Sequence, residues 1–155
     1  MLKFYQKGIT INELLIVFAI IGILISVALP QFSKMKENQV LKNTVSDITS
    51  IFHSTQSQSL ASLNSSEYGV RFQSDRIIVF KGKVFSVDAV DNKTINIISP
   101  ASISNVTLGG VSDTTGDMYF ERLSGSPSKT GTITISTLSF SKIVTISTTG
   151  AVSIN

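Results

Sequence analysis

The chain has 155 residues, ordinarily a single domain, and it is more apolar than charged, with 42% hydrophobic and 15% charged residues. Lys3 and Lys7 lie near the N-terminus, so of 13 basic residues 11 remain against 10 acidic residues in the rest of the chain. This near balance is not that of a strongly basic nucleic-acid-binding protein. With no cysteine, disulfides, thiolate metal sites and cysteine nucleophiles are excluded.

The first predicted element is a membrane helix over residues 9–30. Residues 9–29 read ITINELLIVFAIIGILISVAL, and as a helix they would rise about 31 Å, which matches a hydrocarbon core of about 30 Å. By the positive-inside rule, Lys3 and Lys7 place the N-terminus in the cytoplasm and the chain after Pro30 across the membrane. A secretory signal peptide is the competing interpretation, but the run is too long and Ala28-Leu29-Pro30 is a poor cleavage site.

Glu13 is a charged residue inside this apolar run. An ionised carboxylate in the membrane costs at least about 2 kcal/mol, so it needs water or a partner. Two interpretations are open at this point. Either Glu13 lies near the cytoplasmic interface and reaches water, or a positive group on another subunit neutralises it.

The surrounding residues carry a family resemblance. The run Lys7-Gly8-Ile9-Thr10-Ile11-Asn12-Glu13-Leu14-Leu15, with Ala28-Leu29-Pro30 further on, resembles the class III signal sequence of type IV pilins and type II secretion pseudopilins. Two residues depart from the family pattern: Ile9 stands where the family usually has Phe, and Asn12 where it usually has an aliphatic residue.

The resemblance implies a processing site and an assembly segment. A prepilin peptidase would remove a leader, residues 1–8, by cutting between Gly8 and Ile9, and would methylate the new N-terminus. The α-amino group of Ile9 would then be a cation that can pair with Glu13 of a neighbouring subunit. Thr10, Glu13 and Pro30 would belong to the helix through which subunits assemble.

The membrane helix is predicted to continue as an amphipathic helix over residues 31–65. Its apolar stripe is Leu41, Val45, Ile48 and Phe52, at i, i+4, i+7 and i+11. The pattern continues weakly to Leu60 and Leu63, which predicts a nearly continuous helix from Ile9 to about Leu63.

Residues 66–155 are predicted to form a β-rich head of antiparallel strands, which makes the fold class α+β. Short β-branched and aromatic segments are separated by Gly, Ser, Asn and Asp. The predicted strands are 68–72, 76–80, 83–87, 94–98, 118–120, 131–135, 143–146 and 151–154. Tight turns are expected at Ser74-Asp75, Lys81-Gly82 and Thr148-Thr149-Gly150, and a longer loop over residues 109–117.

Three segments of the head add a finer resemblance. Residues 66–72 (SEYGVRF), 116–120 (GDMYF) and 142–152 (KIVTISTTGAV) are similar to the GspH/FimT group of minor pseudopilins and minor pilins. This implies a low-abundance subunit near a filament tip. The implied partners are the prepilin peptidase, other pilins or pseudopilins and the inner-membrane assembly platform.

No enzymatic site or cofactor is predicted, because phosphate-binding glycine loops, nucleophile elbows and Cys/His metal motifs are missing from the sequence. The lone histidine, His53, is interpreted as a solvated helix residue. The pairs Asp88/Asp91 and Asp113/Asp117 are weak candidates for a cation in a loop.

Two rival functions stay open. In the first, the head of a tip pilin binds DNA or a surface, and the basic residues that converge on one face of the sheet to bind DNA are Arg71, Arg76, Lys81, Lys83 and Arg122. In the second, the chain is a permanent single-pass membrane receptor that keeps Met1.

Overall fold

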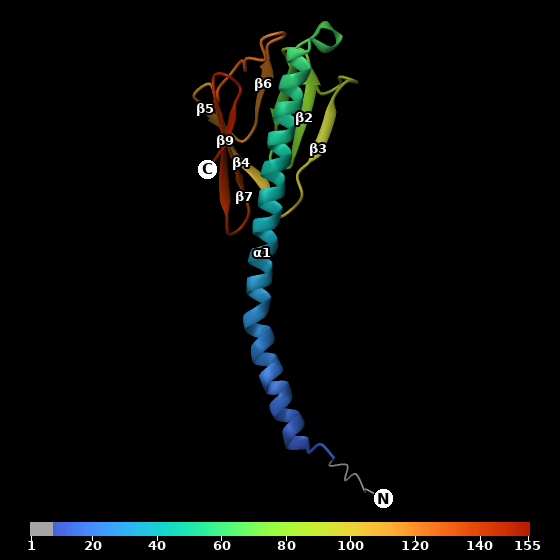
Figure 1. Cartoon of the computed structure of the whole chain (residues 1–155), viewed down its shortest axis with the longest axis vertical. Helices are drawn as coiled ribbons and strands as arrows, with labels where there is room; N and C mark the ends of the chain where they lie inside the picture. The colour runs from blue at the N-terminus through green and yellow to red at the C-terminus, as the bar shows by residue number, and fades with distance from the viewer. Residues whose placement is uncertain (1–7) are drawn as a thin grey trace, which may run out of the picture. The chain divides into compact units, whose positions relative to one another are not determined.

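The computed structural model describes residues 8–155 (Figure 1). Within these residues the chain forms one long helix, α1 (Ile11–Leu60), a short 3-10 helix, η1 (Leu63–Ser65), and nine strands. The strands are β1 (Tyr68–Phe72), β2 (Arg76–Lys81), β3 (Lys93–Asn96), β4 (Ser102–Leu108), β5 (Val111–Asp113), β6 (Gly116–Phe120), β7 (Gly131–Ser136), β8 (Ser141–Ile146) and β9 (Val152–Ile154). The predicted α+β class, a long N-terminal helix followed by antiparallel sheets, is confirmed. Apart from Gly8, the predicted leader lies outside the described residues.

The chain divides into two compact units, one up to Lys36 and one from Glu37 to Asn155. All side chains of residues 8–36 are exposed, so this part of α1 buries nothing within the chain. The second unit, here called the head, contains the rest of α1 and all the strands.

The head part of α1 packs on the sheets through the predicted apolar stripe. Leu41, Val45, Ile48 and Phe52 are all buried, as the i, i+4, i+7 spacing predicts. The predicted continuation to Leu60 and Leu63 is wrong, because both are exposed. The stripe continues instead through Thr55 and Ser59.

Hydrogen bonds explain why hydroxyl side chains are buried at the end of this stripe. Thr55 Oγ1 donates to the Ile51 carbonyl at 2.7 Å, and Ser59 Oγ accepts from the Tyr68 N–H at 3.0 Å. Small satisfied hydroxyls let the first strand approach the helix closely, and they cost little when they are paired.

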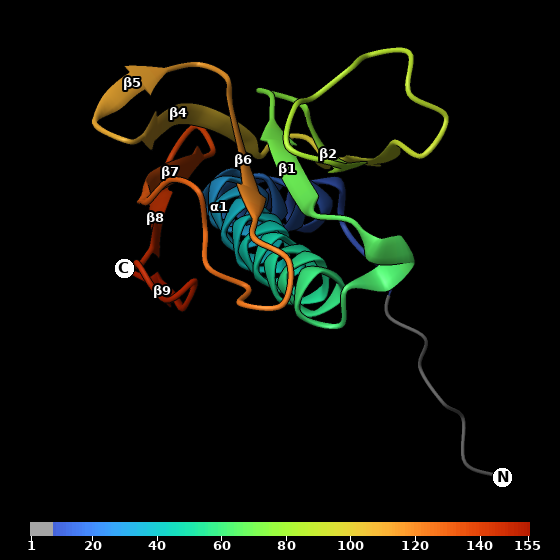
Figure 2. The same ribbon diagram turned by 90° about the horizontal axis from the view of Figure 1, so that it is seen from above.

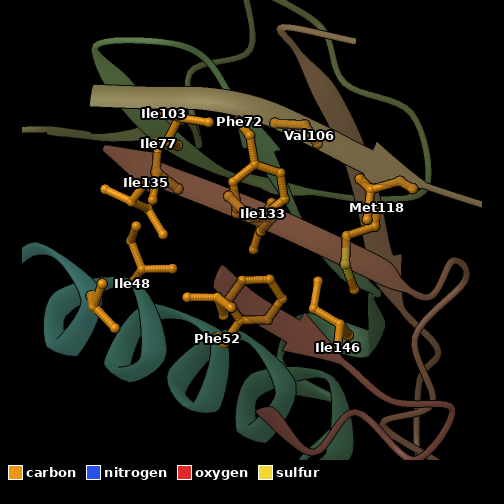
Figure 3. Close-up of a cluster of buried hydrophobic side chains, with 14 of the residues drawn as sticks. Ile48, Phe52, Phe72, Ile77, Ile103, Val106, Met118, Ile133, Ile135 and Ile146 are labelled. Atoms are coloured by element: carbon orange, nitrogen blue, oxygen red, sulfur yellow. The ribbon is translucent and has the colours of Figure 1, made fainter. Parts of the chain in front are cut away.

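Two antiparallel sheets pack against the head part of the helix and leave its other side open (Figure 2). The first sheet has the order β3-β2-β1-β6 and the second the order β5-β4-β7-β8-β9. Side chains from both sheets meet the helix in one core (Figure 3). In this core Phe52 stacks on Phe72 with ring centroids 5.6 Å apart and meets Phe120 edge-on at 6.0 Å.

The predicted strand over residues 83–87 is wrong. These residues belong to the loop 82–92, and Val84 and Val87 are exposed. Gly82 ends β2 with a φ of 101°, and its N–H donates to the Glu67 carbonyl at 2.8 Å. The predicted tight turn at Lys81-Gly82 therefore leads into a long loop and not into a hairpin.

Strand β4 was not predicted from the sequence, and the predicted loop over residues 109–117 contains β5. The register of β4 on β7 shifts between Ile103 and Asn105, so the buried residues Ile103 and Val106 are three apart and the period of two is lost. Gly109 and Gly110 have φ values of 60° and 82° and form the turn between β4 and β5. The predicted turn at Thr148-Thr149-Gly150 is confirmed as the connection of β8 to β9.

Candidate assembly site

The first part of α1 is an apolar surface without cover. Within residues 8–155, α1 is the one helix that is long and apolar enough to cross a membrane, and none of its most apolar 18-residue window is buried. An exposed surface of Ile, Leu, Val and Phe side chains along a whole membrane-length helix is unfavourable in water. The segment therefore needs a bilayer or other protein chains around it.

Thr10 caps the start of this helix. Its Oγ1 accepts a hydrogen bond from the Glu13 N–H at 3.3 Å, and its carbonyl accepts from the Leu14 N–H at 3.2 Å. Thr10 thus takes the N-cap position and satisfies one of the free N–H groups of the first turn.

Glu13 lies in the first turn of α1, three residues after the cap. A carboxylate there is favoured by the positive end of the helix dipole. The pattern Thr10-x-x-Glu13 is that of a capping box, and it was visible in the sequence but not used in the prediction. Glu13 therefore has a local structural reason for its place, in addition to any role between subunits.

The predicted processing residues precede the helix and are open to solvent. Gly8 and Ile9 are both exposed, and a Cβ added to Gly8 would meet no atom within 4 Å. Nothing in the packing of residues 8–155 requires glycine at this position. Pro30, the other predicted assembly residue, lies inside α1 and is also exposed.

Three of the basic residues predicted to contact DNA, Arg71, Arg76 and Lys81, do not form one free cationic patch. Arg71 is 3.4 Å from the Asp117 carboxylate and lies over the Phe85 ring at 4.9 Å. Arg76 is 2.7 Å from the Asp75 carboxylate, and their hydrogen bond lowers the pKa of Asp75 and raises that of Arg76.

Strand alternation separates the third basic residue from the other two. Arg71 is opposite Ile78 in the sheet, and Arg76 and Ile78 share a face of β2. Lys81 falls on the other face of the same strand. Of these three residues, Arg71 and Arg76 therefore lie on one face of the sheet, each beside a carboxylate, and Lys81 lies on the other.

The two acidic pairs are not part of a group of metal ligands in the described residues. Asp88 and Asp91 are exposed in the loop 82–92. Asp117 faces Arg71, and Lys129 Nζ donates to its backbone carbonyl at 3.0 Å. Across the part of the chain that the structure describes, no three His, Asp or Glu side chains are grouped as metal ligands would be. His53 is exposed on α1.

Comparison with known proteins identifies one kind of relative. The chain is 29% identical over 104 residues to a fimbrial protein of Pseudomonas aeruginosa, and the alignment covers 61% of this chain and 67% of the relative. No protein-family model matches the chain. No solved structure matches it significantly. The similarity, together with a pilin-like architecture, supports a type IV pilin-like protein.

Proposed function

We propose that the chain is a structural subunit, of the minor or tip kind, in a type IV pilus or a type II secretion pseudopilus. The similarity to a fimbrial protein supports a pilus subunit and a structural role in place of an enzymatic one. The observation that carries the proposal is the exposed apolar segment of α1, with Glu13 in its first turn, joined to a compact β-rich head. The three head segments similar to the GspH/FimT group support the minor subclass.

Maturation by a prepilin peptidase is part of this proposal. The peptidase would cut between Gly8 and Ile9 and methylate Ile9. Because a Cβ at Gly8 would meet nothing in the chain, a requirement for glycine there would come from an outside protein that binds this segment. The exposed position of both residues fits such recognition.

Assembly would proceed through the exposed segment of α1. In the membrane, lipid covers its apolar side chains, and in the filament other subunits cover them. The Glu13 carboxylate loses water in both environments and needs a cation. The α-amino group of Ile9 in the adjoining subunit would supply that cation and would fix the axial position of one subunit on the next.

The precursor would reside in the bacterial inner membrane, with its N-terminus in the cytoplasm and its head outside. Its partners there would be the prepilin peptidase, other pilins or pseudopilins and the assembly platform. A membrane-anchored pilin is supported by the apolar helix and by the fimbrial relative.

Mass spectrometry of the native N-terminus tests the proposal most directly. The mature chain is expected to begin at methylated Ile9, and Gly8→Ala is expected to leave the precursor uncut. Glu13→Gln should be cut as usual but should enter filaments poorly. Asp47→Asn is the matched control, because Asp47 is an exposed carboxylate elsewhere on α1, and it should assemble normally.

Two results would contradict this function. A native chain that still begins at Met1 would favour the membrane receptor and would remove the pilin interpretation. Normal filament incorporation of Glu13→Gln would reject the charge pair while leaving processing intact.

The alternative function is a DNA- or surface-binding tip pilin. The carboxylate partners of Arg71 and Arg76 weaken its electrostatic basis, since a paired cation has less charge to offer phosphate. Salt-dependent DNA binding that is lost when Arg71, Arg76 and Lys81 are changed to Ala would favour it.

A further inference from the structure

The turn between β7 and β8, residues 137–140, holds apolar side chains out of the head. Leu138 is 92% exposed and Phe140 is 36% exposed. Two hydrogen bonds close the turn: the Thr137 N–H donates to the Phe140 carbonyl at 2.8 Å, and the Phe140 N–H donates to Thr137 Oγ1 at 3.2 Å. Leu138 therefore sits at the tip of a closed turn, in a place where turns usually carry polar residues.

A third hydrogen bond fixes where this turn lies in the head. The Ser139 N–H donates to Glu37 Oε2 at 3.1 Å, and Glu37 is 8% exposed. Glu37 is the first residue of the head. The turn therefore lies at the end of the head where the chain enters from the apolar segment.

The chain between the apolar run and the head is short. Residues 30–36 connect Leu29 to Glu37, and these eight residue steps reach at most about 29 Å when fully extended. As part of α1 they rise only about 12 Å. The headgroup layer of a bilayer is about 5–7 Å deep on each side, so Leu138 and Phe140 are kept near the membrane surface by the covalent chain itself.

Two basic residues of the head accompany the turn. Lys142 follows it at the start of β8, and Lys142 and Lys42 line one hollow of the head surface. The carboxylate of Glu37 is buried against the turn, so it offers little negative charge to solvent. Apolar tips flanked by lysines match the chemistry of an anionic phospholipid surface.

The opposite end of the head provides a contrast. The loop 82–92 carries Val90, which is 100% exposed, but its one lysine, Lys83, is outnumbered by Asp88 and Asp91. The loop begins at Gly82, which bonds to Glu67 next to the Ser59–Tyr68 contact. Ser59 is 22 residues (59 − 37) along α1 from Glu37, or about 33 Å. Figure 1 shows the β2–β3 connection and the β7–β8 turn at opposite ends of the head.

We propose that the turn 137–140 is a membrane-contact site for anionic phospholipid. Leu138 and Phe140 enter the boundary between headgroups and acyl chains, while Lys42 and Lys142 of the head meet lipid phosphates. This contact holds the head on the outer surface of the membrane before the subunit joins a filament. It rests on the membrane-anchored state of the proposed function and goes beyond it.

Single-tryptophan fluorescence tests the contact, because the chain has no tryptophan of its own. Leu138→Trp places the reporter on the turn, where its exposure leaves room for the larger ring. Val90→Trp is the matched control at the far end of the head, and Phe18→Trp reports on membrane insertion of α1. Each full-length variant is reconstituted in vesicles of phosphatidylcholine and phosphatidylglycerol, with and without bromine-labelled lipid.

The contact predicts that Leu138→Trp emits at shorter wavelength than Val90→Trp. It also predicts several-fold stronger quenching by the brominated lipid and weaker quenching by iodide in water. The difference should shrink in vesicles of phosphatidylcholine alone, since the lysines would then lose their anionic partners.

The remaining outcomes separate this contact from the membrane anchor. Iodide quenching of Leu138→Trp equal to that of Val90→Trp, while Phe18→Trp is quenched by lipid, would overturn the contact and leave the anchor in place. Protection of Leu138→Trp from iodide without quenching by brominated lipid would mean a protein contact and would also overturn it. If Phe18→Trp is not quenched by lipid either, the membrane anchor itself fails.

Discussion

Replacement of Phe52 by alanine removes the main aromatic side chain that α1 contributes to the head core. Phe52 is buried, stacks on Phe72 of β1 at 5.6 Å and meets Phe120 of β6 edge-on at 6.0 Å. The change deletes a whole ring from the buried cluster between the helix and the sheets (Figure 3). Loss of a buried Phe side chain costs about 3–5 kcal/mol, which includes the cavity that the neighbours cannot fill.

That cost is a large part of the stability of a domain of this size. A typical domain is stable by about 5–15 kcal/mol, so the variant head would be folded but close to its limit. With a urea dependence of about 2 kcal/mol per M, a loss of about 4 kcal/mol lowers the urea midpoint by about 2 M. Since Phe52 is the point where α1 holds both β1 and β6, the helix would also lose its fixed hold on the head.

The assay is urea unfolding of the full chain in detergent micelles, followed by the near-ultraviolet circular dichroism of its tyrosines. Phe32→Ala is the matched control, because Phe32 lies on the same helix but is 72% exposed. It should leave the midpoint of the head within about 0.25 M of the parent, since surface substitutions usually change stability by no more than about 0.5 kcal/mol. A Phe52→Ala midpoint no lower than that of Phe32→Ala would refute the core assigned to this residue.

Two further predictions concern the head. Gly131→Ala should destabilise it by about 1–3 kcal/mol, because a Cβ at Gly131 would collide with the Thr107 carbonyl across the β4–β7 pair. The urea midpoint measures this loss. Thr132→Ala is the control, because Thr132 is a half-buried neighbour whose replacement should change the midpoint little. Arg76 lowers the pKa of the Asp75 carboxyl in the folded chain, so the unfolded chain binds the proton first as pH falls. This pair therefore adds a small stabilisation above about pH 4 that is lost at lower pH. Asp75→Asn should reduce the fall in the free energy of unfolding between pH 6 and pH 3. An unchanged fall in the variant would contradict this role of the pair.

The pattern of the sequence predicted α1 well because helical periodicity depends on near neighbours. Residues three and four apart share a face whatever surrounds them, and Leu41, Val45, Ile48 and Phe52 are buried as this rule requires. The spacing also holds at the end of the helix, but the residue types there do not show which face is buried. There Thr55 and Ser59 lie on the buried face and Leu60 is exposed, because β1 approaches the helix closely and leaves room only for small hydroxyl side chains.

The strands show where local pattern stops being sufficient. Residues 83–87 have the composition of a strand but find no neighbour to pair with, and they form a loop. Strand β4 has a poor pattern because of its register shift, yet it pairs along most of β7. Pairing with another strand, and not composition, decided both cases.

The candidate site divides in the same way. The place of Glu13 in the first turn and the exposed apolar run could be predicted from the sequence, because both depend on spacing along one helix. The processing role of Gly8 stays a prediction. The capping bond from the Glu13 N–H to Thr10 was also readable, through the Thr-x-x-Glu pattern. The pairing of Arg71 with Asp117 was not, because these residues are 46 apart in the chain and meet only through the β1–β6 register.

The sequence by itself determined the long helix, the apolar stripe from Leu41 to Phe52 and the place of a charge in an apolar run. These properties arise from side chains within a few residues of each other. Only the tertiary structure decided that the turn 137–140 rests on Glu37, 102 residues earlier in the chain. Contacts of this kind depend on the register and curvature of whole sheets, and short-range periodicity carries no information about either.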